Sequence, residues 1–239
     1  MRNVMAAVSH MVARMREMEI TANNLSNANT PGFKKDMYFE NILQDVVARN
    51  EPYFGGQLRL DERELVDLEQ GTLDQTDNPL DLAINGKGFF VVQTDQGEVF
   101  TRNGNFRLNE FGVLINNADH KVLGMGGPIV IEPEFGPVSI SKNGTIMQGD
   151  KLIDQLRMVS PINEDDIVKM GDSGYRFQVD PNGQDQGVIM QGYLEKSNVN
   201  SIKSMTKMIA LQQTFESNQR VLRTVDDIDS LAANRVGKI

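Results

Sequence analysis

The chain has 239 residues, enough for one large or two modest domains, and 39% of them are hydrophobic, which suffices for a packed core. Its 24 basic residues are outnumbered by 33 acidic ones, and the net charge of −9 argues against nucleic acid or an anionic membrane as the main partner, because both are bound by clustered Lys and Arg. Cysteine is absent, which excludes disulfides and thiolate metal sites.

Residues 1–27 carry the apolar spacing of a long helix. A heptad stripe, here called the N-terminal seam, runs along one face of it. The seam consists of Val4, Val8, Met11, Met15, Met18, Ala22 and Leu25. An isolated helix gains little in water, so the seam needs a partner. That partner is either a helix of the same chain, within an ordinary core, or a helix bundle shared between subunits.

The same segment does not read as a membrane or secretion signal. Charged residues such as Arg14 and Glu17 break the apolar stretch that a cleavable secretory signal requires. No apolar run in the chain approaches the roughly 20 residues of a membrane span. We therefore expect no signal cleavage and no membrane insertion.

The predicted first helix ends at residues 25–27, in a stretch rich in asparagine, whose side chain competes for local hydrogen bonds. Pro31 fixes its own φ and Gly32 permits a positive φ, so Thr30-Pro31-Gly32 predicts a turn. Residues 36–70 carry no clear pattern and are assigned as a linker or extended segment, with a hint of helix at 42–47 and of strand at 57–68.

From Gly71 the pattern changes to short apolar stretches between turn residues, which predicts an antiparallel β domain over 71–195. The predicted strands are 82–84, 89–93, 99–102, 106–108, 113–115, 122–123, 129–131, 138–140, 146–147, 154–158, 175–179 and 188–191. Turn residues between these stretches include Asn103-Gly104 and Asn143-Gly144.

The C-terminal segment is again helical in its spacing. Its apolar stripe, here called the C-terminal seam, is interrupted by Gln212 and Gln219. The seam consists of Ile202, Met205, Ile209, Phe215, Leu222, Val225 and Ile228. The predicted fold class is α+β. Residues 1–35 and 196–239 form one discontinuous, coiled-coil-like helical domain, and the antiparallel all-β domain is inserted between its halves.

No arrangement of residues for catalysis, cofactor binding or metal binding is apparent. His10 and His120 each lack a second ligand at metal spacing, so both are interpreted as structural. The motifs of serine hydrolases, phosphate-binding loops and zinc proteases do not occur. The sequence predicts no enzyme and no cofactor.

Three segments closely resemble the signature segments of bacterial flagellar rod and hook proteins. The first comprises Asn23, Asn24, Leu25, Asn27, Asn29, Thr30, Pro31, Gly32 and Phe33, followed by Lys34. The second lies within 71–106 and includes Asn78-Pro79-Leu80-Asp81 and Thr101-Arg102-Asn103-Gly104-Asn105-Phe106. The third runs from Leu194 through Ser197-Asn198-Val199-Asn200 into the last helix. The segments span nearly the whole chain, in the family's order.

The resemblance implies a structural axial subunit of the flagellar basal-body rod that transmits torque. Chain length leaves the proximal and distal rod subfamilies, and segments such as Gly126-Gly127-Pro128-Ile129 favour the proximal one. The alternatives are a distal rod or hook-type axial protein, or a secreted adhesin with a helical stalk, for which a cleavable signal peptide is expected.

The same resemblance implies how the protein assembles. Its terminal helices stack head to tail with those of neighbouring copies and of proximal and distal rod subunits, and the β domain lies outside. The expected partners also include the flagellar type III export apparatus. The expected location is the basal body, in the rod that spans the periplasm, after export from the cytoplasm without signal cleavage.

Overall fold

The computed structural model describes residues 2–42, 60–132, 136–163, 167–171, 174–177 and 187–236. They form two compact units. The first unit, here called the helical unit, takes its described residues from 2–26, 36–42, 60–65 and 200–236. The second, here called the β unit, comprises 27–35 and the described residues between 66 and 199.

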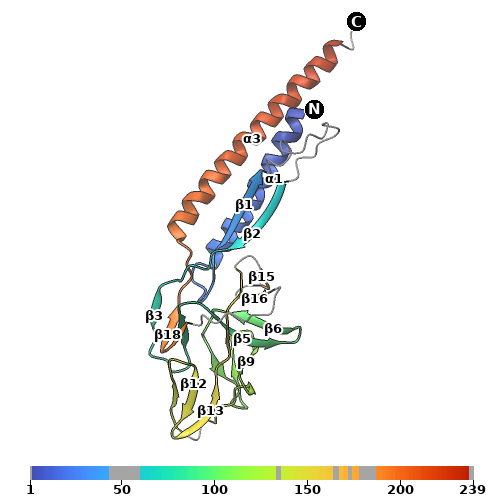
Figure 1. Cartoon of the computed structure of the whole chain (residues 1–239). Coiled ribbons are helices and arrows are strands. Elements are labelled where there is room, and N and C mark those ends of the chain that lie inside the picture. The colour runs from blue at the N-terminus through green and yellow to red at the C-terminus, as the bar shows by residue number, and fades with distance from the viewer. Residues whose placement is uncertain are drawn as a thin grey trace. The chain divides into compact units, whose positions relative to one another are not determined.

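The helical unit contains two long helices and two strands. They are α1 (Arg2–Ser26), α3 (Ser201–Val236), β1 (Asp36–Ile42) and β2 (Leu60–Val66), whose last residue already belongs to the β unit. Figure 1 shows α1 beside α3 and β1 beside α1, in agreement with the contacts between these elements. The strands β1 and β2 pair with each other. Asn200 caps α3, because its side-chain oxygen accepts a hydrogen bond from the Lys203 N–H at 3.0 Å.

The β unit is built from short strands. They are β3 (Leu73–Gln75), β4 (Leu82–Asn85), β5 (Phe89–Thr94), β6 (Gly97–Thr101), β7 (Arg107–Leu108), β8 (Leu114–Ile115), β9 (Lys121–Gly124), β10 (Gly127–Pro128), β11 (Val138–Ile140), β12 (Thr145–Gln148), β13 (Lys151–Gln155), β14 (Met158–Val159), β15 (Ile167–Lys169), β16 (Gly174–Phe177), β17 (Val188–Gln191) and β18 (Tyr193–Glu195). Among the described residues, the largest sheet has the order β15-β16-β6-β5-β9-β8-β7, with β10 on β9 and β14 on β5.

The remaining strands of the β unit form smaller sheets. One has the order β11-β12-β13, and two others pair β17 with β4 and β18 with β3. Wherever the described residues define a register in the β unit, the pair is antiparallel. The predicted α+β class with antiparallel strands is therefore confirmed.

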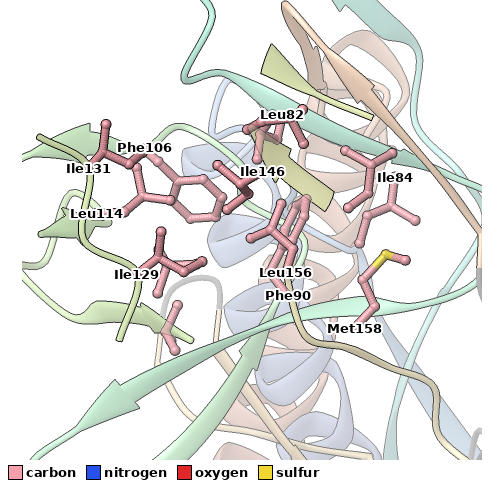
Figure 2. Packing of buried hydrophobic residues seen from close by; sticks show 14 of the residues in the cluster. Leu82, Ile84, Phe90, Phe106, Leu114, Ile129, Ile131, Ile146, Leu156 and Met158 are labelled. Carbon is pink, nitrogen blue, oxygen red and sulfur yellow. The ribbon is translucent and has the colours of Figure 1, made fainter. Parts of the chain in front are cut away.

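Strand β5 lies at the centre of the β unit, because its two faces contribute to two different cores. Phe90 and Val92 belong to one cluster of buried side chains, and Phe89 and Val91 to another. This division follows from the alternation of side chains along a strand. Figure 2 shows the first cluster, where Phe90 lies among side chains from the strands and loops of the unit. In the second cluster, the rings of Phe89 and Tyr175 meet edge to face, with centroids 5.4 Å apart.

Several sequence predictions differ from the structure. The predicted strand at 129–131 is an extended segment held by single backbone hydrogen bonds, including one from the Ile129 N–H to the Val122 carbonyl, with only a bridge at Val130. The predicted strand 154–158 is divided between the ends of β13 and β14. The predicted helix at 42–47 lies outside the described residues apart from Ile42, which ends β1.

The two compact units do not follow the predicted boundaries at 35, 70 and 195. Residues 27–35 and 196–199 lie in the β unit, because they bind to its strands and loops rather than to the helices. The predicted linker 36–70 contains β1, which the sequence did not predict, and β2, which lies within the hint of strand at 57–68. A fragment limited to 71–195 would therefore lack segments that complete the β unit.

Candidate functional site

The predicted N-terminal seam is not the face of α1 that the structure buries. Within the part of α1 whose side chains are described, Ala13, Thr21 and Asn24 are buried. At about 100° per residue, these positions lie about 135° around the helix axis from the seam. The seam residues Met11, Met18 and Leu25 are half-buried, and Met15 is 47% exposed. Ala22 is exposed as well, so the seam is partly covered within the chain and partly open; Val4 and Val8 lie outside the described side chains.

The buried face of α1 is small and polar, and an ion pair links α1 to α3. The carboxylate of Glu17 lies 2.8 Å from the Lys207 ammonium of α3 and 2.6 Å from the Arg14 guanidinium. Burial alone would raise the pKa of Glu17, but the hydrogen bonds from Lys207 and Arg14 outweigh it and lower this pKa. The Glu17 carboxylate therefore stays charged, and its ion pair with Lys207 joins the two helices.

The predicted C-terminal seam is in fact two stripes. Met208, Leu211, Phe215 and Leu222 are buried or half-buried along one face of α3. Ile202, Met205 and Ile209 lie about 120° away at about 100° per residue. They are 79%, 52% and 58% exposed. Val225 and Ile228 lie outside the described side chains. The structure thus leaves an apolar stripe open on each helix, and large exposed apolar groups are typical of interaction surfaces.

The signature segment after α1 is fixed by side-chain amides. Asn24 donates to the Asp36 carbonyl and accepts from the Asp36 N–H, both at 2.8 Å, so its amide group imitates a strand partner. The backbone carbonyl of Asn27 accepts from the Thr30 N–H, and its side-chain oxygen accepts from the Thr30 hydroxyl, each at 3.1 Å. Asn23 and Asn29 are exposed and Pro31 is half-buried.

Gly32 occupies the turn that the sequence predicts. Its φ is +68°, in the region that glycine tolerates and other residues rarely adopt. A Cβ at this position would overlap backbone atoms of Arg102 and Asn103, and the Gly32 N–H donates to the Glu195 carbonyl at 2.7 Å. Phe33 is fully buried next to it, with the Lys169 ammonium 4.1 Å from its ring centre. The turn is therefore packed against the interior of the β unit.

Beside this turn lie two buried cations and one buried carboxylate, here called the charge cluster. The Lys34 ammonium is 2.5 Å from Glu195 Oε1, and the Arg102 guanidinium is 3.3 Å from Glu195 Oε2. All three side chains are at most 5% exposed. Further hydrogen bonds run from Lys34 to the Glu69 carbonyl, from Arg102 to the Ile84 and Gly86 carbonyls, and from the Gly71 N–H to Glu195. One carboxylate therefore serves two cations.

Burial lowers the pKa of Lys34 and of Arg102, and the nearby Glu195 carboxylate opposes this shift at both groups. Sequence reading quoted Lys34 and Arg102 only as parts of signature segments and missed Glu195. Lys34 follows the buried Phe33, but Arg102 and Glu195 have no buried apolar neighbour in the sequence, so the local pattern gave no signal for this cluster.

The β unit also has an open hollow of about 670 Å³ whose lining includes Val92, Thr94, Asn116 and His120. The amide nitrogen of Asn116 lies 3.5 Å from His120 Nδ1, and the backbone N–H of His120 donates to the Asn116 side-chain oxygen at 2.9 Å. Within the described part of the chain, no three His, Cys, Asp or Glu residues gather where a metal ion could bind. Nor does any described helix combine the length and apolar character needed to cross a membrane.

Three protein-family models match the segments that contribute to the charge cluster. Residues 6–34 match the model of the flagella basal body rod protein family, 83–148 that of the flagellar hook protein FlgE/F/G D1 domain, and 190–235 that of the flagellar basal body rod FlgEFG protein C-terminal region. Each charged residue of the cluster thus falls within a different matched region.

Similar proteins extend over nearly the whole chain. The flagellar basal-body rod protein FlgF of Caulobacter vibrioides is 34% identical, with 97% of this chain and 96% of the relative covered. FlgF of Salmonella typhimurium is 35% identical with 91% of each covered, and the rod protein FlgG of Bacillus subtilis is 30% identical with 95% and 96% covered. The similarity therefore includes both helices and the β unit.

Proposed function

The chain belongs to the family of flagellar basal-body rod proteins, and we propose that it assembles head to tail through the exposed apolar stripes of α1 and α3. It is a structural subunit of the rod, of the proximal type, and its place is the flagellar basal body. It associates with other rod components. Its relatives are structural proteins, and the proposal requires no catalysis.

The observation that carries this proposal is the open stripe on each helix. On α1, Met15 is exposed on the N-terminal seam, and on α3, Ile202, Met205 and Ile209 are exposed along one stripe. A soluble monomer gains nothing from these side chains, whereas burial in an assembly stabilises it by about 1.5 to 3 kcal/mol for each large side chain. Two different stripes that meet between copies form a heterologous contact, which generates an open helical array and not a closed ring.

Replacing Met11 and Met15 together by Asp tests the proposal. We expect the isolated chain to fold normally, because both positions lie off the buried face of α1, and rod incorporation to be lost, because the contact would bury two unpaired charges. The measurement is the amount of the chain in purified basal bodies, together with swimming. The matched control replaces both methionines by Leu, which keeps the stripe apolar and should assemble. Normal basal bodies in the Asp variant would remove this seam from the contact.

We also propose that the two chain ends form one discontinuous helical domain for assembly, while the β unit folds without them. Deleting residues 2–25 should therefore abolish rod incorporation and leave the β unit folded, because Phe33 and Lys34 remain. Deleting residues 2–34 should also lower the thermal stability of the β unit, because the Glu195 carboxylate then loses the Lys34 ammonium. Thermal unfolding followed by circular dichroism distinguishes the two; equal stability would show that residues 27–34 are not part of the β unit.

Three further steps complete the proposal. The chain transmits torque, and it contacts proximal and distal rod neighbours and further copies. It is exported by the flagellar type III apparatus without signal cleavage. These steps are supported by family membership, and a rod that spans the periplasm is the expected position of the assembled chain. The mass of the chain purified from basal bodies tests the export route, since cleavage would remove part of the N-terminal seam.

A further inference from the structure

The chain passes between its two units four times, at residues 26–27, 35–36, 65–66 and 199–200. The connecting stretches at the last three passages are hydrogen-bonded to one another inside the β unit, and one side chain takes part in most of these bonds. Asn198 accepts from the Lys35 N–H at 2.8 Å. Its amide group donates to the Asp67 carbonyl at 2.9 Å and to the Glu69 carbonyl at 3.1 Å.

A primary amide suits this position because it combines an acceptor and two donors in one plane. The side-chain oxygen of Asn198 binds the stretch that leads to β1, and its amide N–H groups bind the stretch that follows β2. The two stretches also bind each other, since the Asp67 N–H donates to the Lys35 carbonyl at 2.8 Å. An aspartate would keep the acceptor and lose both donors, and an alanine would lose all three bonds.

The geometry points to Asn198 as a positioning residue that ties together the stretches through which the β unit is connected to β1, β2 and α3. Asn198 lies three residues before α3 begins, and it acts through its hydrogen bonds with Lys35 and Asp67. Loss of Asn198 lets these stretches separate, so that α3 is no longer held together with the β1–β2 pair for assembly. This last step rests on the proposed function, whereas the tie itself does not.

Hydrogen exchange on the soluble full-length chain, followed by NMR amide by amide, tests the tie without reference to the rod. In Asn198→Ala we expect the Asp67 amide to exchange at least tenfold faster, although its own acceptor, the Lys35 carbonyl, is untouched. In Asn198→Asp the Lys35 amide should stay protected, because its acceptor is kept. An unchanged Asp67 exchange rate in Asn198→Ala would overturn the proposal.

The matched control is Asn109→Ala, which also removes side-chain hydrogen bonds within the β unit, to the N–H groups of Phe111 and Val113. It should leave the exchange of Lys35 and Asp67 unchanged and assemble normally. Asn198→Ala should reduce rod incorporation at least fivefold, even at temperatures where both variants are fully folded. Fast exchange with normal incorporation would overturn the role in assembly. Failure of the proposed function itself would be recognised separately, by normal assembly of the Met11→Asp, Met15→Asp variant.

Discussion

Glu195→Gln should lower the free energy of unfolding of the β unit by about 3 to 5 kcal/mol, because it leaves two buried cations without a counter-charge. The glutamine oxygen can still accept from Lys34 and Gly71, but its amide group meets the donors of Arg102, 3.3 Å away. The measurement is urea unfolding followed by circular dichroism, with attention to the transition of the β unit. The loss of unfolding free energy should exceed the loss caused by breaking any single exposed ion pair of the chain.

The matched control for this variant is Glu98→Gln. Glu98 forms an ion pair of 2.7 Å with Arg157, but both side chains are more than a third exposed. Exposed pairs contribute about 0 to 1 kcal/mol. A second variant sharpens the test: adding Lys34→Met to Glu195→Gln should restore part of the lost stability, because it removes one of the two unpaired charges. Equal losses in the Glu195 and Glu98 variants would show that the charge cluster is solvated.

Some elements of the fold were predictable because their local pattern allows one structure only. The predicted strand at 89–93 begins with four consecutive apolar residues, Phe89 to Val92, and is bounded by Gly88 and by the turn before Gly97, which is typical of a strand buried on both faces. In contrast, β2 reads Leu-Asp-Glu-Arg-Glu-Leu-Val, which is nearly all polar in its middle. Its pairing with β1 depends on residues far from it in the sequence, and no local pattern reveals such a partner.

The helical seams were predictable as stripes but not as partners. A heptad pattern indicates that one face of a helix needs burial, but it does not indicate which surface covers that face. On α3 the pattern combined Phe215 and Leu222, which are half-buried, with Ile202 and Met205, which are exposed on another face. On α1 the strongest apolar stripe lies away from the buried face. Only the structure shows how the apolar side chains are distributed among the helix faces, and therefore which stripes are open.

The charge cluster was beyond sequence reasoning for a different reason. Glu195 lies 161 residues from Lys34 and 93 from Arg102, and such separations leave no spacing to recognise. The three signature segments, however, already marked the neighbourhood of each residue. Their convergence gives a physical reason for the resemblance: these segments form one buried site in the β unit, from which the chain continues into both assembly helices.

Gly32→Ala should destabilise the β unit and impair rod assembly by more than backbone strain explains. A non-glycine residue with φ near +68° costs about 1 to 2 kcal/mol. The added Cβ would also overlap the backbone at Arg102 and Asn103. Arg102 is held in the charge cluster and is only 5% exposed, so its backbone has little freedom to retreat. Overpacking of this kind adds about 1 to 3 kcal/mol.

Gly97→Ala separates the two contributions. Gly97 also has a positive φ, of +111°, but a Cβ there would meet nothing within 4 Å. Both variants carry a conformational penalty, which is no smaller at +111° than at +68°, so only the overlap can make Gly32→Ala the more costly variant. We expect Gly97→Ala to lose about 1 to 2 kcal/mol and to enter rods normally. Gly32→Ala should lose about 3 kcal/mol, and its rod incorporation should fall although the chain is still exported. If both variants lose the same stability and assemble equally well, the close packing of Gly32 against Arg102 has no role in assembly.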